Sequence, residues 1–329
     1  MEKYTGLENP SPDIESEKIH EKIWRKIIKY GAIISAATLL VSSETQQTKE
    51  GSAKEGLITE SIPAIQKAKD QMVLLELSEV DLSDAEKVLK SFPEQIDELT
   101  IESVYLPERF DKLIIFIKQK HLQRGNLDIF RRMPKGICRQ MLEEVNENHK
   151  EIYAGILDLK KNIGTNKVFH EGITEEVEPR LKNDLINKTD RVFSFFLYPT
   201  LEKAFTGEEI NINKLSNRYK YAVGAPLLLY ANKEIELVAG EDSKIHEDAF
   251  EIANTVIGSR RDEITDEQED EFKERVHKAR EEFLIKKMII RSEPVLICVF
   301  GQAHDLRDST KKVNEKEQTK AAIITLSAK

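Results

Sequence analysis

The sequence has few of the features that mark the most easily recognised classes of protein. Only two cysteines, Cys138 and Cys298, occur in 329 residues, which excludes a disulfide scaffold and a cysteine-built zinc module. The sequence contains no Gly-x-Gly-x-x-Gly, Gly-x-x-x-x-Gly-Lys-Ser/Thr, Gly-x-Ser-x-Gly or His-Glu-x-x-His motif. The fingerprints of nucleotide enzymes, ordinary serine hydrolases and the common zinc peptidases are therefore missing. Cys298 lies in an apolar run and is expected to be an inert buried thiol, whereas Cys138 is expected at the surface.

Positive charge is also in the minority. The chain has 50 Lys and Arg against 59 Asp and Glu, a formal net charge of −9. This balance argues against a dedicated duplex-DNA binder, which would normally be basic, so we expect no nucleic-acid partner. With 40% apolar and 33% charged residues, the composition is that of a globular protein with a substantial hydrophobic core.

No apolar run is long enough for a comfortable membrane span. The longest uncharged stretch near the N-terminus, Tyr30–Ser43, has fourteen residues, whereas a span needs about 20. It follows the basic segment Lys18–Lys29, an order typical of an export signal. We expect residues 1–45 to be a signal-like or membrane-anchor segment, with membrane association through 27–43, followed by a polar linker at 46–60. The protein would then be exported or membrane-anchored. If Tyr30–Ser43 is instead an ordinary buried helix, the protein is cytoplasmic.

The rest of the chain, residues 61–329, is predicted to be a single α/β domain with a helical insertion at about 173–231. Short apolar runs alternate with long amphipathic stretches, which indicates βαβ units and a mostly parallel central sheet flanked by long helices. An extra strand is expected at Met72–Leu77. The other predicted strands are Lys112–Lys118, Asn166–His170, Glu234–Ala239, Pro294–Phe300 and Ala321–Leu326, and the predicted helices are Ile137–Asn162, Arg191–Phe205 and Thr265–Arg291.

Side chains capable of chemistry follow four of these strands. In open parallel sheets, ligands bind beyond the carboxyl ends of the strands. Histidines and carboxylates gathered there would suit general acid–base hydrolysis or a metal site. We expect the histidines to act as bases or metal ligands, and the glutamates to orient them or to activate water. The candidates in chain order are His121, Glu171, Glu241 with Asp242, and His304 with Asp305.

Each candidate also has a structural interpretation. His121 lies in a basic segment, where it would face solvent. Glu171 before Gly172 suits a strand-to-helix turn, and Glu241 with Asp242 suits the cap of a following helix. His304 is the strongest candidate, because the glycine three residues earlier permits a sharp turn after an apolar strand.

These positions resemble the motifs of a known superfamily. The C-terminal VLICVFGQAHDL, which contains Gly301-x-x-His304, resembles the closing Gly-x-x-His motif of the TraB/Tiki, haem-binding ChaN-like and erythromycin-esterase-like proteins. VFHEG, with Glu171 and Gly172, is similar to their acidic turn, and Glu241-Asp242 to a second one. An early Gly-x-x-His motif is matched by Lys118-Gln119-Lys120-His121, in which the histidine is present and a lysine replaces the glycine. The resemblance covers roughly residues 112–329.

The resemblance implies a polar pocket with histidine and glutamate at its base. Members of this superfamily hydrolyse esters, are proposed to cleave peptides with a metal, or bind haem or iron, so the cofactor would be a divalent transition metal or haem. His121 and His304 would be the metal ligands. The residues expected to contact substrate are Gly172, Asp242, Arg280, Gly301 and Asp305.

Three functions follow as hypotheses. The first is a hydrolase-like protein with a His/Glu pocket, assisted by a metal. The second is a non-catalytic haem or metal-ion binding protein, and the third is a degenerate structural or interaction module. Residues 110–141 carry eight bases and two acids, while residues 241–274 carry thirteen acids and four bases. A small-molecule or peptide ligand of anionic character is therefore expected beside His121.

Overall fold

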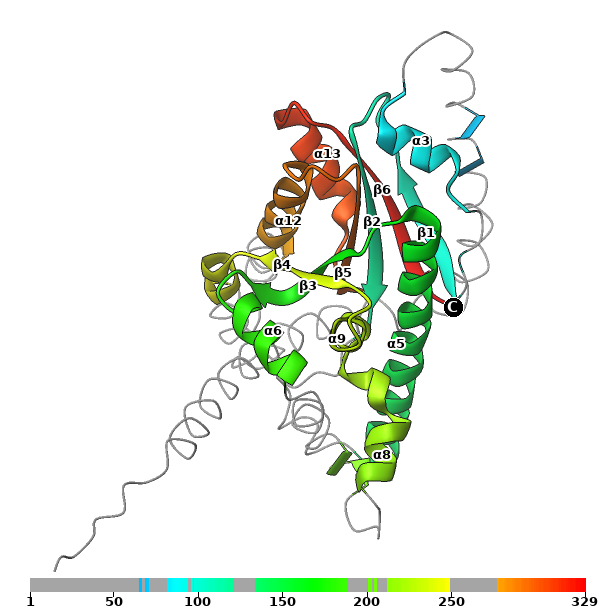
Figure 1. Cartoon of the computed structure of the whole chain (residues 1–329), viewed down its shortest axis with the longest axis vertical. Helices are drawn as coiled ribbons and strands as arrows, with labels where there is room; N and C mark the ends of the chain where they lie inside the picture. The colour runs from blue at the N-terminus through cyan, green and yellow to red at the C-terminus, as the bar shows by residue number, and fades with distance from the viewer. Residues whose placement is uncertain are drawn as a thin grey trace, which may run out of the picture.

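The structure is a computed structural model that describes residues 65–66, 69–70, 82–93, 96, 98–120, 134–187, 201–202, 204–205, 212–248 and 277–329. Six strands form one sheet in the order β1-β6-β2-β5-β3-β4 (Figure 1). Only β1 is antiparallel to its neighbour, and the other pairs are parallel. The α/β fold with a mostly parallel sheet is therefore confirmed. The strands are β1 (Leu99–Tyr105), β2 (Lys112–Gln119), β3 (Lys167–Thr174), β4 (Glu236–Glu241), β5 (Val295–Gly301) and β6 (Ala321–Ala328).

Helices cover both faces of the sheet (Figure 1). The apolar core on one face contains side chains of α3, α5, α6 and α9, and that on the other contains side chains of α12 and α13. Because both faces are covered, β2 and β5 are almost wholly apolar rather than alternating. The helices are α3 (Asp84–Lys90), α5 (Lys135–Ile163), α6 (Glu178–Asn187), α8 (Ile212–Arg218), α9 (Ala225–Ala231), α12 (Ala279–Ile289) and α13 (Leu306–Lys316), with a 3-10 helix η1 (Lys220–Val223).

The long helix α5 returns the chain from the carboxyl end of β2 to the start of β3. Its buried residues recur with helical spacing, as in Leu142, Val145, Ile152 and Ile156. It ends at Gly164, whose φ of 81° is left-handed and whose N–H donates to Lys160 O. Glycine adopts this conformation without the steric cost that a Cβ would bring.

The five predicted strands in the described residues end one to four residues later than predicted, β3, β4 and β5 also begin one or two residues later, and α5 is slightly longer at both ends. The largest difference is in β3, which continues through Glu171 and Gly172 to Thr174 with a shift in register against β4. Gly172 has a φ of 78°. The predicted chain turn is therefore an irregularity within the strand.

Several predicted segments lie outside the described residues. These are residues 1–45, the linker at 46–60, the strand at Met72–Leu77 and most of Arg191–Phe205. Of the helix predicted at Thr265–Arg291, the described part contains α12. None of the helices in the described part of the chain combines the length and the apolar composition that a membrane span requires.

Candidate metal centre

Two carboxylates meet at the carboxyl ends of neighbouring strands. Glu171 in β3 accepts a hydrogen bond from the backbone N–H of Gly301 at 2.5 Å. Glu241, the last residue of β4, accepts one from the N–H of Gly172 at 2.9 Å. The sheet therefore fixes both carboxylates through backbone groups of adjacent strands.

Arg280 of α12 lies between these carboxylates. Its Nε donates to Glu241 Oε1 at 2.6 Å, and its Nη2 donates to Glu171 Oε1 at 2.7 Å and also to Glu241. Only 2% of Arg280 and 1% of Glu241 is exposed to solvent. A buried guanidinium of this kind ties α12 to the ends of β3 and β4.

The charges in this group stabilise one another. Burial alone would raise the pKa of Glu241, but Arg280 and His246 outweigh it and lower that pKa to about 2. Burial would lower the pKa of Arg280, but Glu241 and Glu171 raise it above its usual value. His246 Nδ1 lies 2.7 Å from Glu241 Oε2. Glu241 and Arg280 are therefore both charged at neutral pH.

His304 is held between two carboxylates. Its Nδ1 lies 3.1 Å from Glu281 Oε1, and its Nε2 lies 3.5 Å from Glu171 Oε1. Burial would lower the pKa of His304, but the neighbouring carboxylates of Glu171 and Glu281 raise it to about 9. Without a metal, both ring nitrogens therefore carry a proton at neutral pH, and the imidazole is positively charged.

Glu281, one residue after Arg280 in α12, is fixed at both oxygens. Besides contacting His304, Oε1 accepts from the N–H of Asp305 at 3.2 Å. Oε2 accepts from Ser309 Oγ at 2.6 Å and from Lys278 Nζ at 3.2 Å. Burial would raise the pKa of Glu281, but these partners, with His304 foremost, lower it to about 2. This carboxylate is ionised and well oriented.

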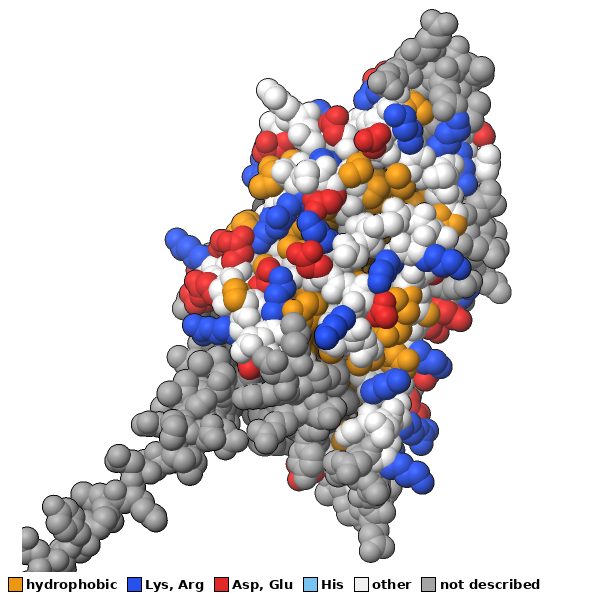
Figure 2. All heavy atoms as spheres, in the orientation of Figure 1, with side chains coloured by type: hydrophobic (Ala, Val, Ile, Leu, Met, Phe, Trp, Pro, Cys, Tyr) orange, Lys and Arg blue, Asp and Glu red, His pale blue; other side chains and the backbone are white. Residues whose placement is uncertain are grey.

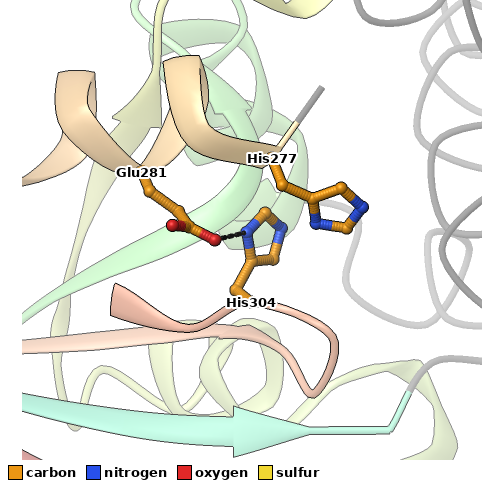
Figure 3. Close-up of side chains that lie close together, drawn as sticks. All are labelled: His277, Glu281 and His304. Carbon is orange, nitrogen blue, oxygen red and sulfur yellow. Dashed lines mark hydrogen bonds and ion pairs between the residues drawn. The ribbon is translucent and has the colours of Figure 1, made fainter. Parts of the chain in front are cut away.

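His277 completes a buried triad with Glu281 and His304. The ring centroids of His277 and His304 lie 4.9 Å apart. One potential ligand atom from each of the three residues lies within 4.8 Å of the others. Figure 3 shows the two rings beside each other, with Glu281 bonded to His304. Burial, with help from the cations His304 and Arg280, lowers the pKa of His277 to about 3. Its imidazole is therefore neutral, the form that binds metals.

The residues fit a divalent transition metal. Two imidazoles and one carboxylate are a common protein donor set for such ions. Ligand atoms around a tetrahedral ion are about 3.3 Å apart when the bonds are about 2.0–2.1 Å. The 3.1 Å between His304 Nδ1 and Glu281 Oε1 is close to this, and the three ligand atoms, which lie within 4.8 Å of one another, would draw together around the ion. The donors to Glu281 would form an outer shell that orients it.

The structure places most of the residues predicted from the sequence near this triad. It brings Glu171, Glu241 and Arg280 into contact, with His304 beside Glu171. Gly301 donates to Glu171. His121 lies outside the described residues.

The remaining predicted residues have backbone roles. Gly172 donates its N–H to Glu241. Asp242 accepts from the N–H groups of Lys244 and Ile245 and caps the helical residues 243–248. Asp305 accepts from the N–H of Arg307 and caps α13.

Sequence reasoning missed three of the residues in contact here. His277 and Glu281 are four residues apart, a spacing that puts them on one face of a helix. This spacing was the feature of the sequence that could have identified them as a pair of ligands. His246 follows Glu241 by five residues across a chain turn, for which the sequence has no comparable pattern.

Cys298 is buried, as expected, and burial raises its pKa above the usual value. The surface position expected for Cys138 is wrong, because α5 buries it against Leu201, Leu215 and Tyr219.

Comparisons with known proteins give no relative for this chain: no family model, no curated protein and no solved structure matches it.

Proposed function

We propose that the protein is a hydrolase assisted by a divalent transition metal that His277, Glu281 and His304 hold. The observation that carries the proposal is the convergence of three buried ligand atoms within 4.8 Å. When bound, such a cation would act as a Lewis acid on a carbonyl or phosphoryl oxygen.

Two further groups support hydrolysis. Glu171 is 8% exposed, whereas Glu241 and Glu281 are each 1% exposed. Of these three carboxylates it is therefore the best placed to accept a proton from an attacking water. Arg280 Nη1 is buried and has no hydrogen-bond partner among the described residues. A donor of this kind would stabilise negative charge that develops on a substrate oxygen.

Metal titration tests whether the triad binds a metal ion. Protein treated with a chelator should bind one Zn²⁺ or Mn²⁺ per chain, and His277→Gln should weaken this binding at least about tenfold, as loss of one ligand does. His149→Gln is the matched control, because His149 is also buried but is hydrogen-bonded to backbone atoms of Lys120 and Ala225. Absence of stoichiometric binding in the wild-type protein would end the metal proposal.

A screen of ester, amide and phosphoester substrates tests turnover. Glu171→Gln should abolish any hydrolysis that the wild-type protein shows, while metal remains bound in equal amount. If metal binds and Glu171→Gln leaves hydrolysis unchanged, Glu171 has no part in the reaction.

The second candidate is a metal-ion binding protein without turnover. The near-complete burial of Glu281 and His304 favours it, because catalytic metal sites keep one position open to substrate. Stoichiometric metal without activity on any substrate would support this function. A Soret band in the purified protein would instead support haem binding, the other form of this hypothesis.

A further inference from the structure

Two buried side-chain carboxamides on the face of the sheet opposite α12 have polar atoms without a hydrogen-bond partner in the described part of the chain. Gln119 at the end of β2 is 1% exposed, and neither its Nε2 nor its Oε1 has a partner in the described part of the chain. Asn146 of α5 is 5% exposed, and its Oδ1 likewise has none there. Because most buried polar groups in proteins are hydrogen-bonded, each exception calls for an explanation.

The backbone places both carboxamides at the same end of the contact between α5 and β2. Asn148 Oδ1 accepts from the N–H of Lys120 at 2.9 Å, and His149 Nε2 lies 2.5 Å from Lys120 O. This turn of α5 therefore lies against the residue that follows Gln119. Asn146 precedes His149 by three residues, and the two share one face of the helix.

The strand pattern directs Gln119 to that helix. Side chains alternate between the two faces of a strand, and Gln119 follows Ile115 and Ile117, which belong to the core on the α5 side. In the neighbouring strand β5, the residue paired with Gln119 is Gly301, which has no side chain beyond its hydrogen. No β5 side chain at this register therefore covers the Gln119 carboxamide.

We propose that Gln119 and Asn146 bind a primary carboxamide group of a ligand. The unpartnered atoms are one NH₂ group and two carbonyl oxygens. In Asn146, Nδ2 donates to Glu147 Oε1 at 3.5 Å, so the atom of this amide that lacks a partner is its oxygen. A primary carboxamide has one acceptor oxygen and two N–H donors, which match this set. Its oxygen would accept from Gln119 Nε2, and its two N–H groups would donate to Gln119 Oε1 and Asn146 Oδ1.

The same set of donor and acceptor atoms excludes two related ligand groups. A carboxylate has no N–H donor, and an N,N-dialkyl amide has none either. Neither would satisfy the two carbonyl oxygens. The site contains no residue of the metal triad, so it does not rest on the proposed hydrolase function.

Binding of small amides to the full chain tests the proposal. Benzamide should bind saturably in ligand-observed NMR or calorimetry, whereas benzoate and N,N-dimethylbenzamide should bind at least about tenfold more weakly, since each loses hydrogen bonds to buried groups. Chelator should not change this binding.

Apolar substitutions assign the binding to these residues. Gln119→Leu and Asn146→Leu should each weaken benzamide binding about tenfold or more while the variants stay folded, because an apolar side chain removes unsatisfied polar atoms. Gln140→Leu is the matched control, since Gln140 is an exposed amide on the same helix bonded to Glu144. Unchanged affinity in both buried variants, or no saturable binding of benzamide to the wild-type protein, would overturn the proposal. So would a crystal structure in which ordered waters satisfy all three atoms and benzamide fails to displace them.

Discussion

The guanidinium of Arg280 donates from Nε to Glu241 Oε1 at 2.6 Å in an almost fully buried contact. The same guanidinium also bonds to Glu171. One cation therefore compensates two buried carboxylates that belong to different strands. Since Glu281 is the next residue of α12, this contact also sets the position of one member of the metal triad.

Removing the Arg280 charge is expected to be strongly destabilising. Arg280→Met leaves Glu171 and Glu241 buried without their main partner, and breaking a buried pair costs about 3–5 kcal/mol of unfolding free energy. Chemical denaturation at neutral pH measures the change. Arg218→Met is the matched control, because its partner Glu143 lies 3.6 Å away and both side chains are more than half exposed. That substitution should cost less than about 1 kcal/mol, and equal costs at the two sites would contradict the buried network.

Acid should reduce the contribution of Glu241 to stability. Its pKa is about 2 in the folded protein against an ordinary value of 4.5. A lowered folded-state pKa adds stability above the unfolded pKa, and this is lost as pH falls from about 5 towards about 2. The difference in unfolding free energy between wild type and Glu241→Gln should therefore shrink by about 2–3 kcal/mol over this range. A difference that stays constant with pH would mean that Glu241 has an ordinary pKa.

The strands of the parallel sheet were predictable because burial on both faces leaves continuous apolar sequence. Lys112–Lys118 and Pro294–Phe300 coincide with β2 and β5 to within one residue at each end. β1 was not predicted. This strand is antiparallel at the sheet edge and partly exposed along most of its length, so its sequence lacks such a run.

The candidate site was predictable only where residues follow strands. Glu171, Glu241 and His304 follow from the rule that parallel strands end at one edge. The carboxylate that contacts His304 Nδ1 comes from α12, and its position depends on how that helix packs on the sheet. No local pattern specifies such packing, which is why Glu281 and His277 required the structure.

Both cysteine thiols should be unreactive in the native protein. Burial raises the pKa of Cys298, and Cys138 is also completely buried. Because the thiolate is the reactive form, alkylating agents should modify neither residue until the protein unfolds. Mass spectrometry after brief treatment with iodoacetamide, with and without denaturant, measures this. Rapid native labelling of Cys138 would show that the contact of α5 with Leu201 and Leu215 opens readily.

Replacing each of two glycines of α5 by alanine should have different effects on the free energy of unfolding. A Cβ on Gly155 would lie 2.3 Å from Leu99 Cδ1, whereas one on Gly136 would have nothing within 4 Å. Gly155→Ala should therefore cost about 1–3 kcal/mol of unfolding free energy by overpacking the contact with β1. Gly136→Ala should instead be neutral or add up to about 1 kcal/mol, because alanine favours helix. Combining Gly155→Ala with Leu99→Ala should relieve the clash, so the double variant should be more stable than the two separate costs predict. Additive costs, measured by thermal or urea denaturation, would show that α5 and β1 do not approach this closely.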